Sequence, residues 1–302
     1  MAEVTADQVL SKLNELDLHL SPEINYRLET IFLEIEGFFV NKKIREKFQL
    51  VQWIEPFLKE VLLEHEQVLF VSRGGRELDC QRVIFALTNL RMLCMHQTGN
   101  HAGCPYWTIY YSQIEALKNT FLEHPKFYFK DGTKLSLRDF PKQELPTLHD
   151  VFEKSSQRFQ EQELDPTVSQ SRENICGNCF KIVSNQGNHC EACGANFWSP
   201  FEIGIRSLFF PLWGSFTIRP FSFALAELST YVVFGLSVLV LEAKSNPVLV
   251  ALMFVLFHMT ASAVGYKLTA KGLYLKEVPA DSAAANDQFD GSLNPDAPTR
   301  FS

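Results

Sequence analysis

Two long apolar stretches near the end of the chain constrain its fold more than any other feature. Residues 221–241 contain one charged side chain, Glu227. Residues 247–266 contain no Asp, Glu, Lys or Arg, and they contain one histidine, His258. An α-helix rises about 1.5 Å per residue, so each stretch is long enough to cross a hydrocarbon core of roughly 30 Å. Since the rest of the chain is too small to surround two apolar helices, the sequence predicts two membrane-spanning helices.

The loop between the two predicted spans is short, which fixes their topology. Residues 242–246 alone separate them, so the spans must run antiparallel as a transmembrane hairpin over residues 221–266. Basic residues flank the outer ends of this hairpin: Arg206, Arg219, Lys267, Lys271 and Lys276. Because cytoplasmic flanks carry the excess of Lys and Arg, we expect an integral membrane protein with both termini in the cytoplasm.

Two ionisable residues lie within the predicted spans at similar depths. Glu227 is about seven residues from the cytoplasmic end of its helix, and His258 is about eight residues from the end of its own. An ionisable group in lipid is costly and turns toward a protein partner, so we expect the two side chains to form an intramembrane polar pair. Two alternatives stay open: Glu227 is protonated and neutral, or it pairs with another subunit.

Four of the seven cysteines form two CxxC motifs shortly before the first span. The motifs are CGNC, with Cys176 and Cys179, and CEAC, with Cys190 and Cys193. A gap of two residues lets both thiolates of one turn reach the same ion, about 2.3 Å from each sulfur, and two such turns complete a tetrahedral site. Zn²⁺ is therefore the expected cofactor, and iron held as in rubredoxin is the alternative metal.

The paired CxxC motifs resemble those of the zinc-ribbon family and define a ribbon over residues 175–198. Four protein ligands leave no open position for substrate, so the metal would be structural. Three glycines are expected to supply tight or positive-φ turns: Gly177, Gly187 and Gly194. His189 is expected to be an exposed loop residue. Free thiolates and the scattered Cys80, Cys94 and Cys104 favour a reducing compartment.

The first half of the chain changes character near residue 66. Apolar residues at helical spacing predict an N-terminal helical bundle over residues 1–65. Its first helix has a capping-box pattern at Thr5, a second is expected to begin at Ser21-Pro22-Glu23, and Pro56 is expected to break a later helix near Ile54. Short β-rich runs separated by turn residues then predict a meander of strands and a closing helix over residues 66–160.

Three segments of this β-rich region resemble the bacterial pleckstrin-homology (PH) and GRAM-like pattern: residues 87–93 (LTNLRML), 111–117 (YSQIEAL) and 127–132 (FYFKDG). The resemblance implies a PH-like domain that serves as a lipid-facing or protein-facing adaptor. The family's phosphoinositide-binding residues do not carry over, because the first hairpin has Arg73 and Arg76 but no dense Lys/Arg cluster. We expect these two arginines to be solvated turn charges.

The remaining segments complete a multidomain α+β membrane protein. A polar linker is expected over residues 161–174, and an aromatic interfacial segment at headgroup depth over residues 199–220. Residues 267–279 form a cytoplasmic flank, and residues 280–302 have the composition of a disordered tail.

No catalytic motif is present in the sequence, and we expect no enzymatic activity. The formal net charge of −7 argues against a nucleic-acid partner. We expect a non-enzymatic membrane-anchored adaptor or regulator that contacts membrane lipids and a protein partner or a second copy of itself. A subunit of an oligomeric channel or transporter that uses Glu227 and His258 is one alternative. A lipid sensor acting through the PH-like domain is another.

Overall fold

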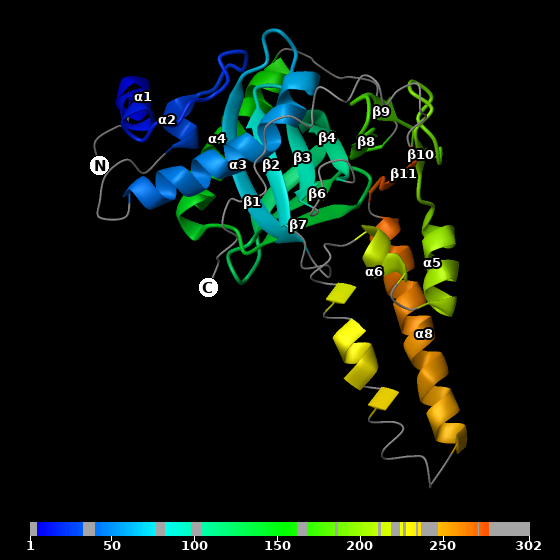
Figure 1. Cartoon of the computed structure of the whole chain (residues 1–302). Helices are drawn as coiled ribbons and strands as arrows, with labels where there is room; N and C mark the ends of the chain where they lie inside the picture. The colour runs from blue at the N-terminus through cyan, green and yellow to red at the C-terminus, as the bar shows by residue number, and fades with distance from the viewer. Residues whose placement is uncertain are drawn as a thin grey trace.

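The fold joins a curled β-sheet with its covering helices to a long apolar helix that projects from one side (Figure 1). The computed structural model describes residues 5–32, 40–76, 82–97, 104–161, 168, 170–184, 187–210, 213–218, 224–225, 228–233, 235–236, 247–270 and 272–277. The predicted tail over residues 280–302 lies outside them.

A curled antiparallel half-barrel forms the body of the protein. Its strands are β1 (Val68–Arg76), β2 (Arg82–Thr88), β3 (Arg91–Gln97), β4 (Tyr106–Tyr110), β5 (Ile114–Asn119), β6 (Pro125–Phe129) and β7 (Lys134–Arg138). The long strand β1 pairs with β2 and, at its end, with β7, which bends the sheet back on itself. Two short strands, β8 (Glu173–Ile175) and β9 (Ile182–Val183), extend the sheet beyond β4, so its order is β5-β6-β7-β1-β2-β3-β4-β8-β9.

Both faces of strands β1 to β3 are covered, which explains their continuous apolar sequences. Alternate residues such as Phe70 and Phe85 point into the half-barrel, where α4 (Leu145–Glu161) supplies Leu148 and Phe159. The residues between them, such as Ile84, face the N-terminal helices. Because side chains alternate across a strand, each strand takes part in two hydrophobic clusters.

The N-terminal helices share one core with the outer face of the sheet. They are α1 (Ala6–Glu15), α2 (Leu28–Ile31) and α3 (Val40–Val61). The capping box at Thr5 is confirmed: its hydroxyl accepts from the backbone N–H of Gln8 and its backbone N–H donates to the Gln8 side chain. Ile54 and Phe57 of α3 are almost fully buried in the cluster that also contains Ile84 of β2.

Two predicted helix boundaries are wrong. Pro56 lies inside α3 and does not end it, because the buried residues Ile54, Phe57 and Leu58 hold both sides of the proline against the sheet. No helix begins at Pro22. Residues 25–27 instead pair with the start of β1: Arg27 N–H donates to Val68 O at 2.8 Å, and Val68 N–H donates to Asn25 O at 2.9 Å.

A buried ion pair fixes the turn between β2 and β3 against the end of α3. The side chain of Glu66 is fully buried and that of Arg91 is 9% exposed, and Arg91 Nη2 lies 2.9 Å from Glu66 Oε2. Arg91 Nε and the Thr88 hydroxyl both donate to Glu66 Oε1, at 3.0 and 2.7 Å. Arg91 Nη2 also donates to the carbonyl of Val61 at 2.6 Å. Both charges therefore have several partners, as burial requires.

Candidate metal centre

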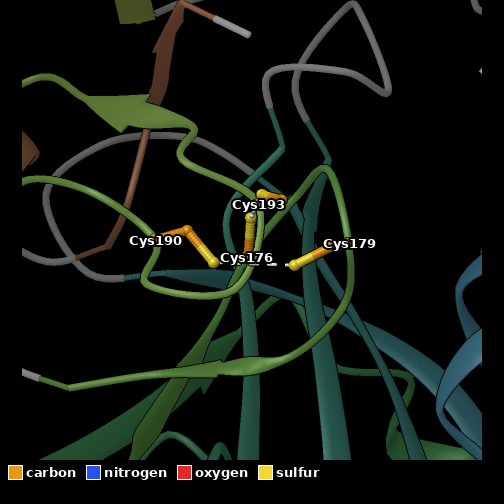
Figure 2. Close-up of side chains that lie close together, drawn as sticks. All are labelled: Cys176, Cys179, Cys190 and Cys193. Carbon is orange, nitrogen blue, oxygen red and sulfur yellow. Dashed lines mark hydrogen bonds between the residues drawn. The ribbon is translucent and has the colours of Figure 1, made fainter. Parts of the chain in front are cut away.

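The structure brings the four predicted cysteines together in one cluster (Figure 2). All four sulfur atoms lie within 4.8 Å of one another. Cys176 Sγ is 3.7 Å from Cys193 Sγ, and Cys179 Sγ is 3.5 Å from Cys190 Sγ. A tetrahedral ion with sulfur ligands at about 2.3 Å requires sulfur separations of about 3.8 Å, whereas a disulfide requires about 2.05 Å. The spacing fits a shared metal ion and excludes disulfides within these two pairs.

The two CxxC turns have the same backbone geometry. Cys176 N–H donates to Lys181 O and Phe180 N–H donates to Cys176 O. The second turn repeats this pattern with the same residue spacing: Cys190 N–H donates to Ala195 O, and Gly194 N–H donates to Cys190 O. Each turn therefore has the backbone hydrogen-bond pattern of a metal-binding knuckle, and the two turns hold their first cysteines in equivalent backbone positions.

The position after the second cysteine adopts positive φ in both knuckles, at 54° for Phe180 and 72° for Gly194. The expected positive φ is confirmed at Gly194. Gly177 and Gly187 lie in tight turns without positive φ. Phe180 tolerates the left-handed conformation because its ring packs against Tyr106, with the ring centres 5.5 Å apart.

Burial makes uncompensated thiolates unfavourable at this site. It raises the pKa of Cys176, and it raises the pKa of Cys179 to about 11. Burial also acts to raise the pKa of Cys193, but hydrogen bonds with Asn178, the backbone of Ala195, Cys179 and Cys176 together outweigh it and lower that pKa to about 7. A divalent cation bound to all four thiolates would offset half of their negative charge and stabilise the deprotonated forms, so its binding would release protons.

The donor set fits a structural metal ion. Four thiolates complete a tetrahedral shell, so no position is open for a reacting water, and zinc or iron would satisfy the same geometry. His189 is exposed and does not belong to the cluster, as expected. The chain matches no protein-family model, no curated protein and no solved structure. The four-cysteine cluster is therefore identified by its geometry.

The ribbon is continuous with the half-barrel on one side and with the apolar helix on the other. Strand β8, which ends one residue before Cys176, pairs with β4. Strand β10 (Asn196–Phe197) pairs with β11 (Leu275–Glu277). The paired residues Phe197 and Leu275 are 78 positions apart in the sequence. Leu275 also packs on the buried cluster of the cysteines. Strand β11 falls within the predicted cytoplasmic flank, for which the sequence predicted no strand.

Charged and aromatic residues that the sequence separates meet beside the ribbon. Arg206 and Lys276 lie on the ring of Trp198, at 4.9 and 4.8 Å from its centre. Both cations also bind Glu202, at 2.8 and 2.9 Å. In the sequence, Arg206 and Lys276 appear as independent flanking charges, because neither motif nor periodicity indicates that β11 returns to this point.

The long helix α8 (Pro247–Thr269) corresponds to the second predicted span. By length and composition, its residues Ala251–Thr269 form the one helix in the described ranges that could cross a membrane, and 11% of that window is buried. The first predicted span, residues 221–241, lies mostly outside the described residues. Its described pieces are helical, and the ring centre of Tyr231 is 5.3 Å from that of Phe257 in α8.

Helix α5 (Pro200–Phe209) lies along the ribbon end of α8 and is packed through small residues (Figure 1). A Cβ on Gly204 would meet Tyr266 at 3.5 Å, and the hydroxyl of Ser262 donates to Gly204 O at 2.7 Å. A Cβ on Gly265 would lie 2.9 Å from Ser207 Oγ. The small face of α8 at Ser262 and Gly265 therefore contacts α5.

Of the predicted pair Glu227 and His258, His258 lies within the described residues. His258 Nδ1 lies 2.6 Å from Leu208 O. A carbonyl oxygen can only accept a hydrogen bond, so Nδ1 carries the proton and donates it. His258 Nε2 is buried and has no hydrogen-bond partner among the described residues, and Glu227 lies outside them. In a helical first span, Glu227 would precede Tyr231 by one turn, and the Tyr231 ring centre is 6.5 Å from that of His258.

The pairing predicts coupled effects of two substitutions. Glu227→Gln and His258→Gln should each lower the thermal stability of the full chain in detergent. The double variant should be less destabilised than the sum of the two by about 1 kcal/mol, since either change removes the same interaction. The control pair Glu227→Gln with Thr260→Val should be additive, because the Thr260 hydroxyl donates within α8 to Leu256 O. Additivity of Glu227→Gln and His258→Gln would contradict the pairing.

Proposed function

We propose that this protein is a non-enzymatic, membrane-anchored adaptor or regulator in which a structural zinc ribbon joins a PH-like interaction module to a two-helix membrane hairpin. The pairing of β10 with β11 is the observation that carries the proposal. Strand β10 lies just before α5, and β11 follows α8, so both ends of the apolar segment meet at one ribbon. This arrangement suits a joint that sets the position of the half-barrel relative to a membrane.

The interaction module is proposed from the half-barrel. Strands β1 to β7 curl into an antiparallel sheet, and α4 follows them and fills the concave side with Leu148, Val151 and Phe159. Seven curled strands followed by one helix are the arrangement that the PH-like resemblance implies. Such a module binds lipids or proteins and performs no chemistry, which agrees with a closed four-ligand metal site.

The orientation is proposed from the ends of α8. Its Thr269 end leads to the ribbon and to the cluster of Arg206, Lys276 and Glu202, whereas its Pro247 end projects away from the half-barrel (Figure 1). Charges at the ribbon end and an apolar helix beyond it support a position of the ribbon at the cytoplasmic membrane surface. The close rings of Tyr231 and Phe257 support an antiparallel hairpin.

Membrane extraction tests the anchor. Leu252, Val255 and Leu256 of α8 are each more than half exposed, and their replacement by glutamate should move the chain from the alkali-resistant membrane pellet to the supernatant. Each charge near the middle of a spanning helix costs about 2.5 to 3.5 kcal/mol. A matched triple variant, with glutamate at the exposed Leu10, Leu63 and Ile182, should stay in the pellet. Wild-type protein in the alkaline supernatant would contradict the proposal.

A further inference from the structure

Three lysines surround one tyrosine on the outer face of strands β5 to β7. The Nζ atoms of Lys118, Lys126 and Lys134 lie 5.7, 5.5 and 5.3 Å from the centre of the Tyr128 ring. Lys118 is directly opposite Lys126 in the β5–β6 ladder, and Lys134 is directly opposite Tyr128 in the β6–β7 ladder. Like charges opposite each other destabilise a sheet, and cation–π contact with one ring offsets this only in part.

The turn next to this cluster presents apolar side chains to solvent. Phe121 is 101% exposed and Leu122 is 65% exposed. The turn is nevertheless ordered by hydrogen bonds: Thr120 N–H donates to His124 O at 2.9 Å, and His124 N–H donates to the Thr120 hydroxyl at 3.1 Å. An apolar tip is therefore held out beside a basic face.

Few acidic groups oppose these lysines. Along β5 to β7 and their two turns, the acidic residues are Glu115, at the irregular pairing of β5, Glu123, at the tip, and Asp131, whose carboxylate accepts hydrogen bonds from Thr133. The carboxylate of Glu123 is paired with Lys142 at 2.6 Å. The face around Tyr128 is thus positively charged in a chain whose formal net charge is −7, which makes it complementary to an anionic surface.

We propose that the lysine face (Lys118, Lys126 and Lys134) and the apolar tip (Phe121 and Leu122) form a docking site for the anionic surface of the bilayer that holds α8. The tip enters the interfacial region, and the ammonium groups contact lipid phosphates and carboxylates. This inference rests on the proposed membrane anchor and names the surface through which the half-barrel would meet the membrane.

Three features favour a lipid surface over an acidic protein. Bulky apolar residues flanked by lysines are typical of segments that lie at headgroup depth. In Figure 1, β6 and β7 lie on the side of the half-barrel toward the membrane helices, whereas α1 lies on the far side. A domain tethered to the membrane has a high effective concentration at its surface, so a small contact suffices.

Amide hydrogen exchange of the full chain in nanodiscs tests the docking site. One set of discs contains phosphatidylcholine alone and the other contains added phosphatidylserine. Exchange over residues 117–128 should be about tenfold slower in the anionic discs, and added salt should reverse the difference. The variant Lys118→Gln/Lys126→Gln/Lys134→Gln should lose this protection, and Phe121→Ser/Leu122→Ser should reduce it. The matched variant Lys42→Gln/Lys59→Gln/Lys154→Gln should retain it.

Equal exchange in the two kinds of disc, with the chain still bound to both, would overturn the docking site and leave the anchor intact. Slower exchange in neutral discs that appears only after an acidic protein is added would also overturn the docking site and would indicate a protein partner. Release of the chain from both kinds of disc on gel filtration would contradict the anchor itself, and the docking site with it.

Discussion

Replacement of Cys190 by serine should abolish tight metal binding and unfold the ribbon. The four sulfur atoms lie within 4.8 Å of one another, so each provides one of four ligands to any shared ion. Metal binding supplies on the order of 10 kcal/mol to the folding of small four-ligand zinc domains, and the ribbon has little core beyond its cysteines, Val183, Ala195 and Phe197. Elemental analysis should fall from about one metal ion per chain to near zero.

The control for this prediction is Cys104→Ala. Cys104 is also buried, but it belongs to the hydrophobic cluster between the N-terminal helices and the sheet, and its sulfur is not one of the four clustered sulfur atoms. This variant should keep its metal ion. A Cys190→Ser protein with an unchanged metal content and an unchanged proteolysis pattern within residues 175–198 would contradict the assignment of the four-cysteine site.

Replacement of Arg91 by methionine should destabilise the half-barrel by about 3 to 5 kcal/mol. The change leaves the fully buried carboxylate of Glu66 without its cation, although Thr88 and the backbone N–H of Leu63 still donate to it. For a unit of this size, the midpoint of thermal unfolding should fall by about 10 °C. The fluorescence of the buried Trp107 in β4 is a suitable measure.

The double variant Glu66→Gln/Arg91→Met separates the unpaired charge from lost packing. It removes both charges, so it should recover a large part of the stability that Arg91→Met loses. Equal stability of the wild type and Arg91→Met would show that the ion pair does not hold the β2–β3 turn to the end of α3.

Local patterns predicted the parts of the fold that depend on near neighbours. The CxxC spacing identified all four clustered cysteines, and β-rich runs separated by turn residues predicted the meander of strands, although no such run covered β5. The errors arose where packing outweighed local preference. Pro56 is held inside α3 by its buried neighbours, and residues after Pro22 pair with the start of β1 and do not form a helix there.

Pairings between distant segments could not be predicted from the sequence. Strand β8 joins the half-barrel through β4, and β11 returns across the whole apolar segment to β10. No periodicity indicates such partners, because strands of two or three residues carry almost no pattern. The lysine face was missed for the same reason: Lys118, Lys126 and Lys134 are separated in the sequence and meet only through the strand register.

The central claim is that a metal-folded ribbon ties the base of the membrane segment to the half-barrel. Amide exchange of residues 275–277 in the nanodisc-bound full chain, measured before and after a chelator strips the metal, tests it most directly. Exchange at β11 should be slow with metal and fast without it, while residues 252–262 of α8 stay protected by lipid. Slow exchange at β11 after complete metal removal would contradict the claim.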